Sequence, residues 1–148
     1  MRTSNFTMLL PAAFLISALL ISPEGSTAET GLVIVANKSV VTEKITPQEI
    51  KSIFLGQLVR WPDNSQIHVA TLSREDIHEA FVKAFTQKTP SQFQRWWREM
   101  LFTGKGTLPK SFNSEDKLIG YVSETEGAIG YVSLKPNSKN VKIITIDK

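Results

Sequence analysis

Residues 46–56 read TPQEIKSIFLG and carry the start and stop signals of one helix. Thr46 supplies an N-cap, and Glu49, three residues later, can close a capping box. Pro47 suits the first helical position, and the glycine that ends the stretch suits a left-handed stop. The apolar residues fall on one helical face: Ile50, Ile53 and Phe54. We therefore predict a helix over residues 47–55 with one buried side.

A second helix with the same start signals follows later in the chain. Thr89 and Pro90 stand at its cap and first position, and Gln92 can complete the box. Its apolar residues recur every three to four positions, as on a core-facing helix: Phe93, Trp96, Trp97, Met100 and Leu101. Because two of the aromatic residues are adjacent, one points off the core face. We expect Trp97 or Trp61 to be available for a protein contact.

Apolar, β-branched runs around these helices predict buried strands. The runs lie at residues 32–36, 67–72, 129–133 and 141–146, and further helices are expected at 73–85 and 114–122. Strands that alternate with helices form layered α/β folds, and continuous apolar runs are typical of strands covered on both faces. We predict a single three-layer α/β domain with a mixed sheet.

The first 28 residues have the pattern of a secretory signal peptide. Arg2 precedes an apolar run over residues 8–21, and Ser26-Thr27-Ala28 supplies small residues for cleavage. The run is short for a membrane span, which needs about 17–25 residues. We expect cleavage after Ala28, a folded domain of residues 29–148 and a periplasmic location. The alternative is a retained membrane anchor.

Charge and composition argue against several function classes. The formal net charge is +3, which is too weak to indicate nucleic-acid binding without a clustered basic face. His68 and His78 are the two histidines of a chain without cysteine, and they do not predict a metal site. They do not predict a Ser-His-Asp triad either. We therefore expect no enzymatic activity, no metal, no cofactor and no nucleic-acid partner.

Three segments resemble the phosphate ABC transporter substrate-binding protein family. They are the helix and loop at residues 45–57 and 60–63 (ITPQEIKSIFLGQ and RWPD), the strand at 33–37 (VIVAN) and residues 126–132 (EGAIGYV). Full members of that family have two lobes that close over the ligand. The chain is similar to the part that forms the second lobe. The resemblance implies one lobe of a type 2 periplasmic binding protein, with phosphate or a similar oxyanion as ligand.

In the two-lobe relatives, the second lobe offers oxyanions a Ser-Gly-Thr-like turn at a helix N-terminus. The matching place here contains Ser73 and Arg74, directly after a predicted strand. The serine hydroxyl can donate to an anion, and the guanidinium can bind it with two hydrogen bonds. Glu75 and Asp76, which replace small neutral residues, oppose an anion. The alternative is a helix capped by its own Ser73, with Asp76 at the third position.

Gly104, Lys105, Gly106 and Thr107 form a second candidate anion site. Two glycines permit a concave run of backbone N–H groups, and the lysine adds positive charge. The alternative is structural: Gly104 ends the aromatic helix, and Lys105 complements the negative end of its dipole. The loop Asn37-Lys38-Ser39 is a third candidate.

These expectations lead to one function and one alternative. We expect an exported solute-binding-type module that binds phosphate or a similar oxyanion weakly, with a membrane transporter or another exported protein as candidate partners. The alternative is a protein-interaction module that kept the lobe fold, and a homodimer would bring two binding faces together. A basic hollow at Ser73 and Gly104 would favour the first. An exposed aromatic patch near Trp61 or Trp97 would favour the second.

Overall fold

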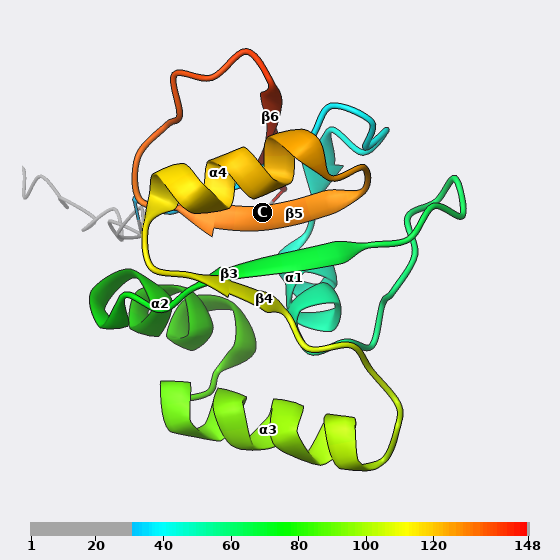
Figure 1. The fold of residues 1–148 in the computed structure, drawn as a ribbon, viewed down its shortest axis with the longest axis vertical. Coiled ribbons are helices and arrows are strands. Elements are labelled where there is room, and N and C mark those ends of the chain that lie inside the picture. Colours follow the sequence, from blue (N-terminus) through cyan, green and yellow to red (C-terminus); the bar gives the residue numbers. More distant parts are fainter. Residues whose placement is uncertain (1–30, 148) are drawn as a thin grey trace, which may run out of the picture.

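The computed structural model describes residues 31–147, which form one mixed sheet with helices on both faces (Figure 1). The predicted signal peptide and its cleavage site after Ala28 lie outside these residues. The strands are β1 (Val33–Asn37), β2 (Lys44–Ile45), β3 (His68–Leu72), β4 (Lys110–Phe112), β5 (Ala128–Val132) and β6 (Val141–Ile146). The helices are α1 (Pro47–Phe54), α2 (Glu75–Phe81), the π-helix η1 (Val82–Thr86), α3 (Pro90–Phe102) and α4 (Glu115–Glu124). No helix within the described range is both long and apolar enough to span a bilayer.

The six strands lie in the order β2-β6-β1-β5-β3-β4. Strand β1 is antiparallel to both of its neighbours, β5 and β6. Strand β3 is parallel to both of its neighbours, β4 and β5, and β2 is parallel to β6. The predicted mixed sheet is therefore confirmed.

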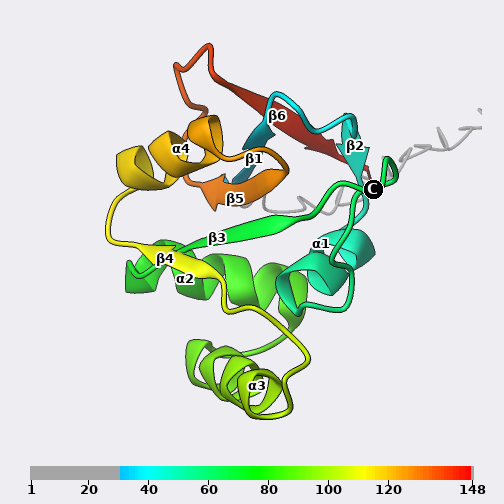
Figure 2. The ribbon, with the colours of Figure 1, turned by 45° about the vertical axis from the view of Figure 1, so that its right-hand side comes forward.

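Consecutive residues of β5 show which helices cover each face, because side chains alternate across a strand. Gly130 lies under Leu118 of α4, and a Cβ atom there would be 2.7 Å from the leucine side chain. Tyr131 faces the other way and stacks on Phe81 of α2, with a centroid distance of 3.8 Å. Phe54 of α1 also contacts this ring. Figures 1 and 2 show the resulting layers: α4 on one face, α1 and α2 on the other, and α3 outside α2.

Both predicted capping boxes are present. The Thr46 hydroxyl accepts a hydrogen bond from the Glu49 N–H, and the Glu49 carboxylate accepts from the Thr46 N–H at 2.8 Å. Thr89 and Gln92 make the same pair of contacts at the start of α3. Gly56 has a φ of 71°, as the predicted helix stop requires.

The tryptophans of α3 hold that helix against the end of α1. Trp97 Nε1 donates to the Phe54 carbonyl at 3.0 Å, and Trp96 Nε1 donates to the Leu55 carbonyl at 2.9 Å. Carbonyls at a helix end have no partner within the helix, so the two indoles satisfy them.

Two expectations about exposure were wrong. Trp97 and Trp61 are only 5% and 4% exposed, so neither offers a protein contact. Trp61 belongs to the core, where its indole N–H donates to the Gly127 carbonyl at 2.9 Å. Leu101, expected in the core, is 51% exposed and lines a groove one turn beyond Trp97.

Candidate functional site

The carboxyl ends of three parallel strands meet at one edge of the sheet. Strands β3, β4 and β5 run in the same direction and end at Leu72, Phe112 and Val132. Open α/β sheets commonly bind ligands beyond such ends. Ser73 and Arg74 follow β3 directly, so they lie where these strands end. We call this carboxyl-terminal side of the sheet, as distinct from its outermost strands, the strand-end edge.

Ser73 is held by the neighbouring strand rather than by its own helix. Its backbone N–H donates to the Phe112 carbonyl at 2.8 Å, and its hydroxyl donates to the same oxygen at 3.2 Å. Helix α2 therefore begins one residue later than the self-capped alternative requires, with Arg74 at the N-cap and no side-chain cap. That alternative was wrong, because the pairing of β3 with β4 takes up the serine.

Arg74 forms an ion pair within its own turn. Its guanidinium lies 2.9 Å from the Asp76 carboxylate, and both side chains are more than half exposed. The hydrogen bond from Arg74 lowers the pKa of the Asp76 carboxyl below its ordinary value, so the aspartate is ionised at neutral pH. An anion at this edge would compete with Asp76 for the guanidinium.

The loop after α3 has the geometry of a helix end. Gly104 has a φ of 67°, and its N–H donates to the Leu101 carbonyl. The N–H of Lys105 donates to the Met100 carbonyl at 3.2 Å. Gly106 packs on Trp97, since a Cβ there would lie 3.2 Å from the indole ring. Two of the backbone donors that an anion would need are therefore already engaged.

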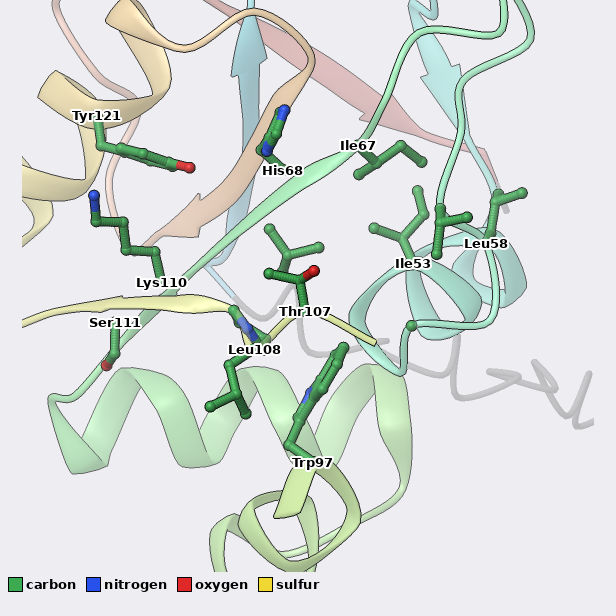
Figure 3. Close-up of a pocket in the computed structure, with 14 residues that line it drawn as sticks. Ile53, Leu58, Ile67, His68, Trp97, Thr107, Leu108, Lys110, Ser111 and Tyr121 are labelled. Carbon is green, nitrogen blue, oxygen red and sulfur yellow. The ribbon is translucent and has the colours of Figure 1, made fainter. Parts of the chain in front are cut away.

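Two grooves flank residues 108–109, and their linings separate the predicted site residues. We call the first the Lys110 groove (Figure 3), which has a volume of about 420 Å³. The second, the His78 groove, has a volume of about 580 Å³. Ser73 lines the His78 groove and Thr107 lines the Lys110 groove, whereas Arg74, Gly104, Lys105 and Gly106 line neither.

The Lys110 groove has a lining that is mostly apolar and includes some polar side chains. Figure 3 shows Ile53, Ile67 and Trp97 among the apolar lining residues and His68 and Lys110 among the polar ones. The Lys110 ammonium lies 5.0 Å from the centre of the Tyr121 ring, which is within cation–π range. The aromatic ring thus already holds this cation.

His78, which lines the His78 groove and is half buried, is paired with the buried Tyr131. The Tyr131 hydroxyl accepts a hydrogen bond from the Leu72 N–H at 3.1 Å and lies 2.7 Å from His78 Nδ1. Burial lowers the pKa of His78 and raises that of Tyr131. Both groups are therefore neutral at neutral pH.

Sequence reasoning missed this pair because nothing in the spacing of the two residues links them. They lie 53 positions apart, on a helix and on a strand that the fold brings together. The one available signal was the hydroxyl of Tyr131, a polar group within the otherwise apolar run of β5. No cluster of three or more potential metal-ligating side chains occurs within residues 31–147.

The fold matches part of several solved binding proteins. An ABC-type phosphate transport receptor from Vibrio cholerae matches with a TM-score of 0.51 and 18% identity, covering 78% of this chain and 46% of the receptor. A putative phosphate ABC transporter substrate-binding protein from Clostridium perfringens, solved with bound phosphate, matches with a TM-score of 0.53 and 18% identity; the match covers 78% and 44%. PstS from Borrelia burgdorferi matches with a TM-score of 0.50 and 14% identity, covering 78% and 47%.

The chain has the fold of one lobe of such a protein. It spans about half the length of the structures it matches. The predicted α/β fold class and the resemblance to one lobe of these binding proteins are thereby confirmed. Neither a protein-family model nor a curated protein gives a match to the sequence. The Vibrio cholerae protein is named as a receptor and the Clostridium perfringens protein as a substrate-binding protein.

Proposed function

We propose that the chain is an exported binding module of the solute-binding type whose strand-end edge takes phosphate or a similar oxyanion weakly. The observation that carries this proposal is the position of Ser73 and Arg74 at the carboxyl ends of three parallel strands, in a fold shared with phosphate-binding proteins. Ligands bind beyond the carboxyl ends of such strands, where the free N–H groups at the start of the following helix attract anions.

Weak binding follows from the contacts of the same two residues. The Ser73 hydroxyl donates to a carbonyl, and the Arg74 guanidinium is paired with Asp76. An anion must displace both contacts and is repelled by the aspartate. Because the edge is open to water, solvent screens each new contact. The loop at Gly104–Thr107 is left out of the proposed site, since two of its N–H groups are engaged in ending α3.

Phosphate titration followed by NMR tests the proposal. The amide signals of Ser73 and Arg74 should shift at tens of millimolar phosphate or sulfate and should not shift with chloride. Asp76→Asn releases the guanidinium and removes the repulsion, so the affinity should rise about fivefold. Glu79→Gln is the matched control, because this exposed carboxylate on the same helix contacts Lys83 instead of Arg74. Equal shifts with chloride, or equal gains in the two variants, would remove the proposed site.

Exposed apolar side chains favour protein interaction as a second function. Phe102, at the last position of α3, is 85% exposed, and Leu101 and Leu108 are about half exposed. A patch of this kind marks contact surfaces in many soluble proteins. A second copy of the chain or another exported protein, such as a component of a membrane transporter, would be the partner.

Light scattering over a range of protein concentrations tests the second copy as partner. The wild-type chain should associate at high concentration, and Phe102→Ser should shift the association to higher concentration. A monomer mass for both proteins throughout the range would exclude self-association through this surface.

A further inference from the structure

The His78 groove has the size and lining of a small-molecule site. Its volume of about 580 Å³ falls within the range of ligand pockets, about 300–1,000 Å³. By area, most of its wall is apolar: Phe93, Trp97, Leu101, Leu108 and Pro109. Half of the lining residues are polar, among them Ser73, His78, Gln94, Arg98 and Ser111. We propose that this groove binds a small organic carboxylate with an apolar body.

The apolar wall combines fixed and exposed parts. Phe93 and Trp97 are buried and held by packing, and the indole of Trp97 also donates to the Phe54 carbonyl. Leu101 and Leu108 are about half exposed, so a ligand that covers them removes apolar surface from water. Such burial is favourable in proportion to the area covered. A ligand with a carbon body therefore gains more here than an inorganic ion does.

His78 offers the groove one hydrogen-bond donor. Because the Tyr131 hydroxyl accepts from the Leu72 N–H, its own proton is directed to His78 Nδ1, which leaves the imidazole proton on Nε2. Nε2 makes no hydrogen bond to another residue within the described range, where every buried side-chain nitrogen or oxygen has a partner. Nε2 is therefore open to solvent, and because His78 lines the groove, it can donate to an acceptor on a bound ligand.

Arg98 supplies the positive charge. It lines the groove, its side chain is exposed, and its guanidinium makes no ion pair within residues 31–147. The lining contains no aspartate or glutamate. A guanidinium binds a planar carboxylate through two parallel hydrogen bonds. One carboxylate balances its single charge, whereas a phosphate dianion would bring uncompensated charge against the apolar wall.

The proposal does not depend on anion binding at the strand-end edge. Ser73 belongs to both sites, but Arg74 and Asp76, which decide binding at the edge, do not line the groove. Phosphate titration reports on Ser73 and Arg74, while a carboxylate in the groove is detected at the Trp97 indole. Failure of one proposal is thus distinguishable from failure of the other.

NMR titration with 3-phenylpropionate, and with its neutral analogue 3-phenylpropionamide, tests the ligand class. The acid should shift the Trp97 indole N–H signal and bind about fivefold more tightly than the amide, because the amide has no charge for Arg98 to pair with. The Trp61 indole, which lines neither groove, should stay in place as an internal reference. Equal affinities for acid and amide, or no shift at Trp97, would overturn the proposal.

Two arginine variants on the same helix locate the charge. Arg98→Gln should lose about fivefold in affinity for 3-phenylpropionate and should then bind acid and amide equally. Arg95→Gln is the matched control, because Arg95 lies in a different hollow beside Lys88 and Trp96. Unchanged binding by Arg98→Gln, or the same loss in both variants, would also overturn the proposal. Both arginines are exposed, so neither change should disturb folding.

Discussion

Tyr131 joins three parts of the core through one buried side chain. Its ring stacks on Phe81 at 3.8 Å, its hydroxyl accepts from the Leu72 N–H at the end of β3, and the same hydroxyl contacts His78 of α2. Burial keeps the phenol neutral, since it raises the pKa of the hydroxyl. The pairing fixes the orientation of His78 at the groove wall.

Removal of this hydroxyl should destabilise the fold. Tyr131→Phe leaves the Leu72 N–H and His78 Nδ1 without their partner, so the free energy of unfolding should fall by about 1–3 kcal/mol. Urea unfolding followed by circular dichroism measures the loss. Tyr121→Phe is the control, because that side chain is half buried and its hydroxyl makes no hydrogen bond to another described residue. Equal losses in the two variants would contradict the role given to the Tyr131 hydroxyl.

His78 should make stability depend on pH in the weakly acidic range. Burial lowers its pKa in the folded state below the ordinary 6.5, so between the two pKa values the unfolded chain binds more protons. Its contribution is complete above about pH 6.5 and is lost as the pH falls through the folded pKa. Urea unfolding at about pH 7.5 and about pH 5.5 measures the effect. The free energy of unfolding should fall more between these pH values for the wild type than for His78→Gln. Parallel drops would mean that the imidazole titrates freely.

Helices α1 and α3 are joined by aromatic side chains, and this contact should carry much of the stability of the outer layer. Trp97 is buried and donates to the Phe54 carbonyl, so Trp97→Ala should cost about 3–5 kcal/mol. Trp96 is only half buried, and its truncation should cost less. Phe102→Ala, on the same helix, should have little effect because this ring is exposed. Thermal melts rank the three, and a different order would show that the helix docks by another face.

The elements that could be predicted are those whose signals are local. Both capping boxes were read from Thr46 and Thr89, because the residues that form them are three positions apart. Strands β2 and β4 were missed, since two or three residues without an apolar run carry no period. The capping role expected for Ser73 failed for a related reason. Its partner, the Phe112 carbonyl, lies on one of the missed strands.

The exposure of the aromatic residues depended on contacts that no local pattern encodes. The buried indole of Trp61 donates its hydrogen bond to the carbonyl of Gly127, which lies 66 positions away in the sequence. Trp96 and Trp97 both turn toward the end of α1, so the expectation that one of them points away from the core held only in part. The grooves beside residues 108–109 likewise arise from the meeting of distant segments.

At the scale of the whole molecule, the proposed strand-end site lies on a single lobe-like domain formed by residues 31–147. The chain spans about half the length of the matched receptors. A ligand at its strand-end edge therefore keeps part of its hydration. The two proposed sites differ in the interactions that would carry binding. Binding at the strand-end edge would depend on charged contacts exposed to water, whereas binding in the His78 groove would depend on apolar surface and one ion pair.

The open edge predicts an affinity that is low and sensitive to salt. Phosphate should bind with a dissociation constant on the order of millimolar, equivalent to about −4 kcal/mol. The affinity should fall several-fold between about 0.01 M and about 0.15 M sodium chloride, because the screening length shortens from about 30 Å to about 8 Å. NMR titrations at both salt concentrations measure this, and light scattering on the same samples gives the mass.

A dimer in which the strand-end edges of two copies face each other would enclose the anion. The affinity for phosphate would then rise with protein concentration and lose its salt dependence. Micromolar phosphate binding that salt does not weaken would therefore contradict a single open edge.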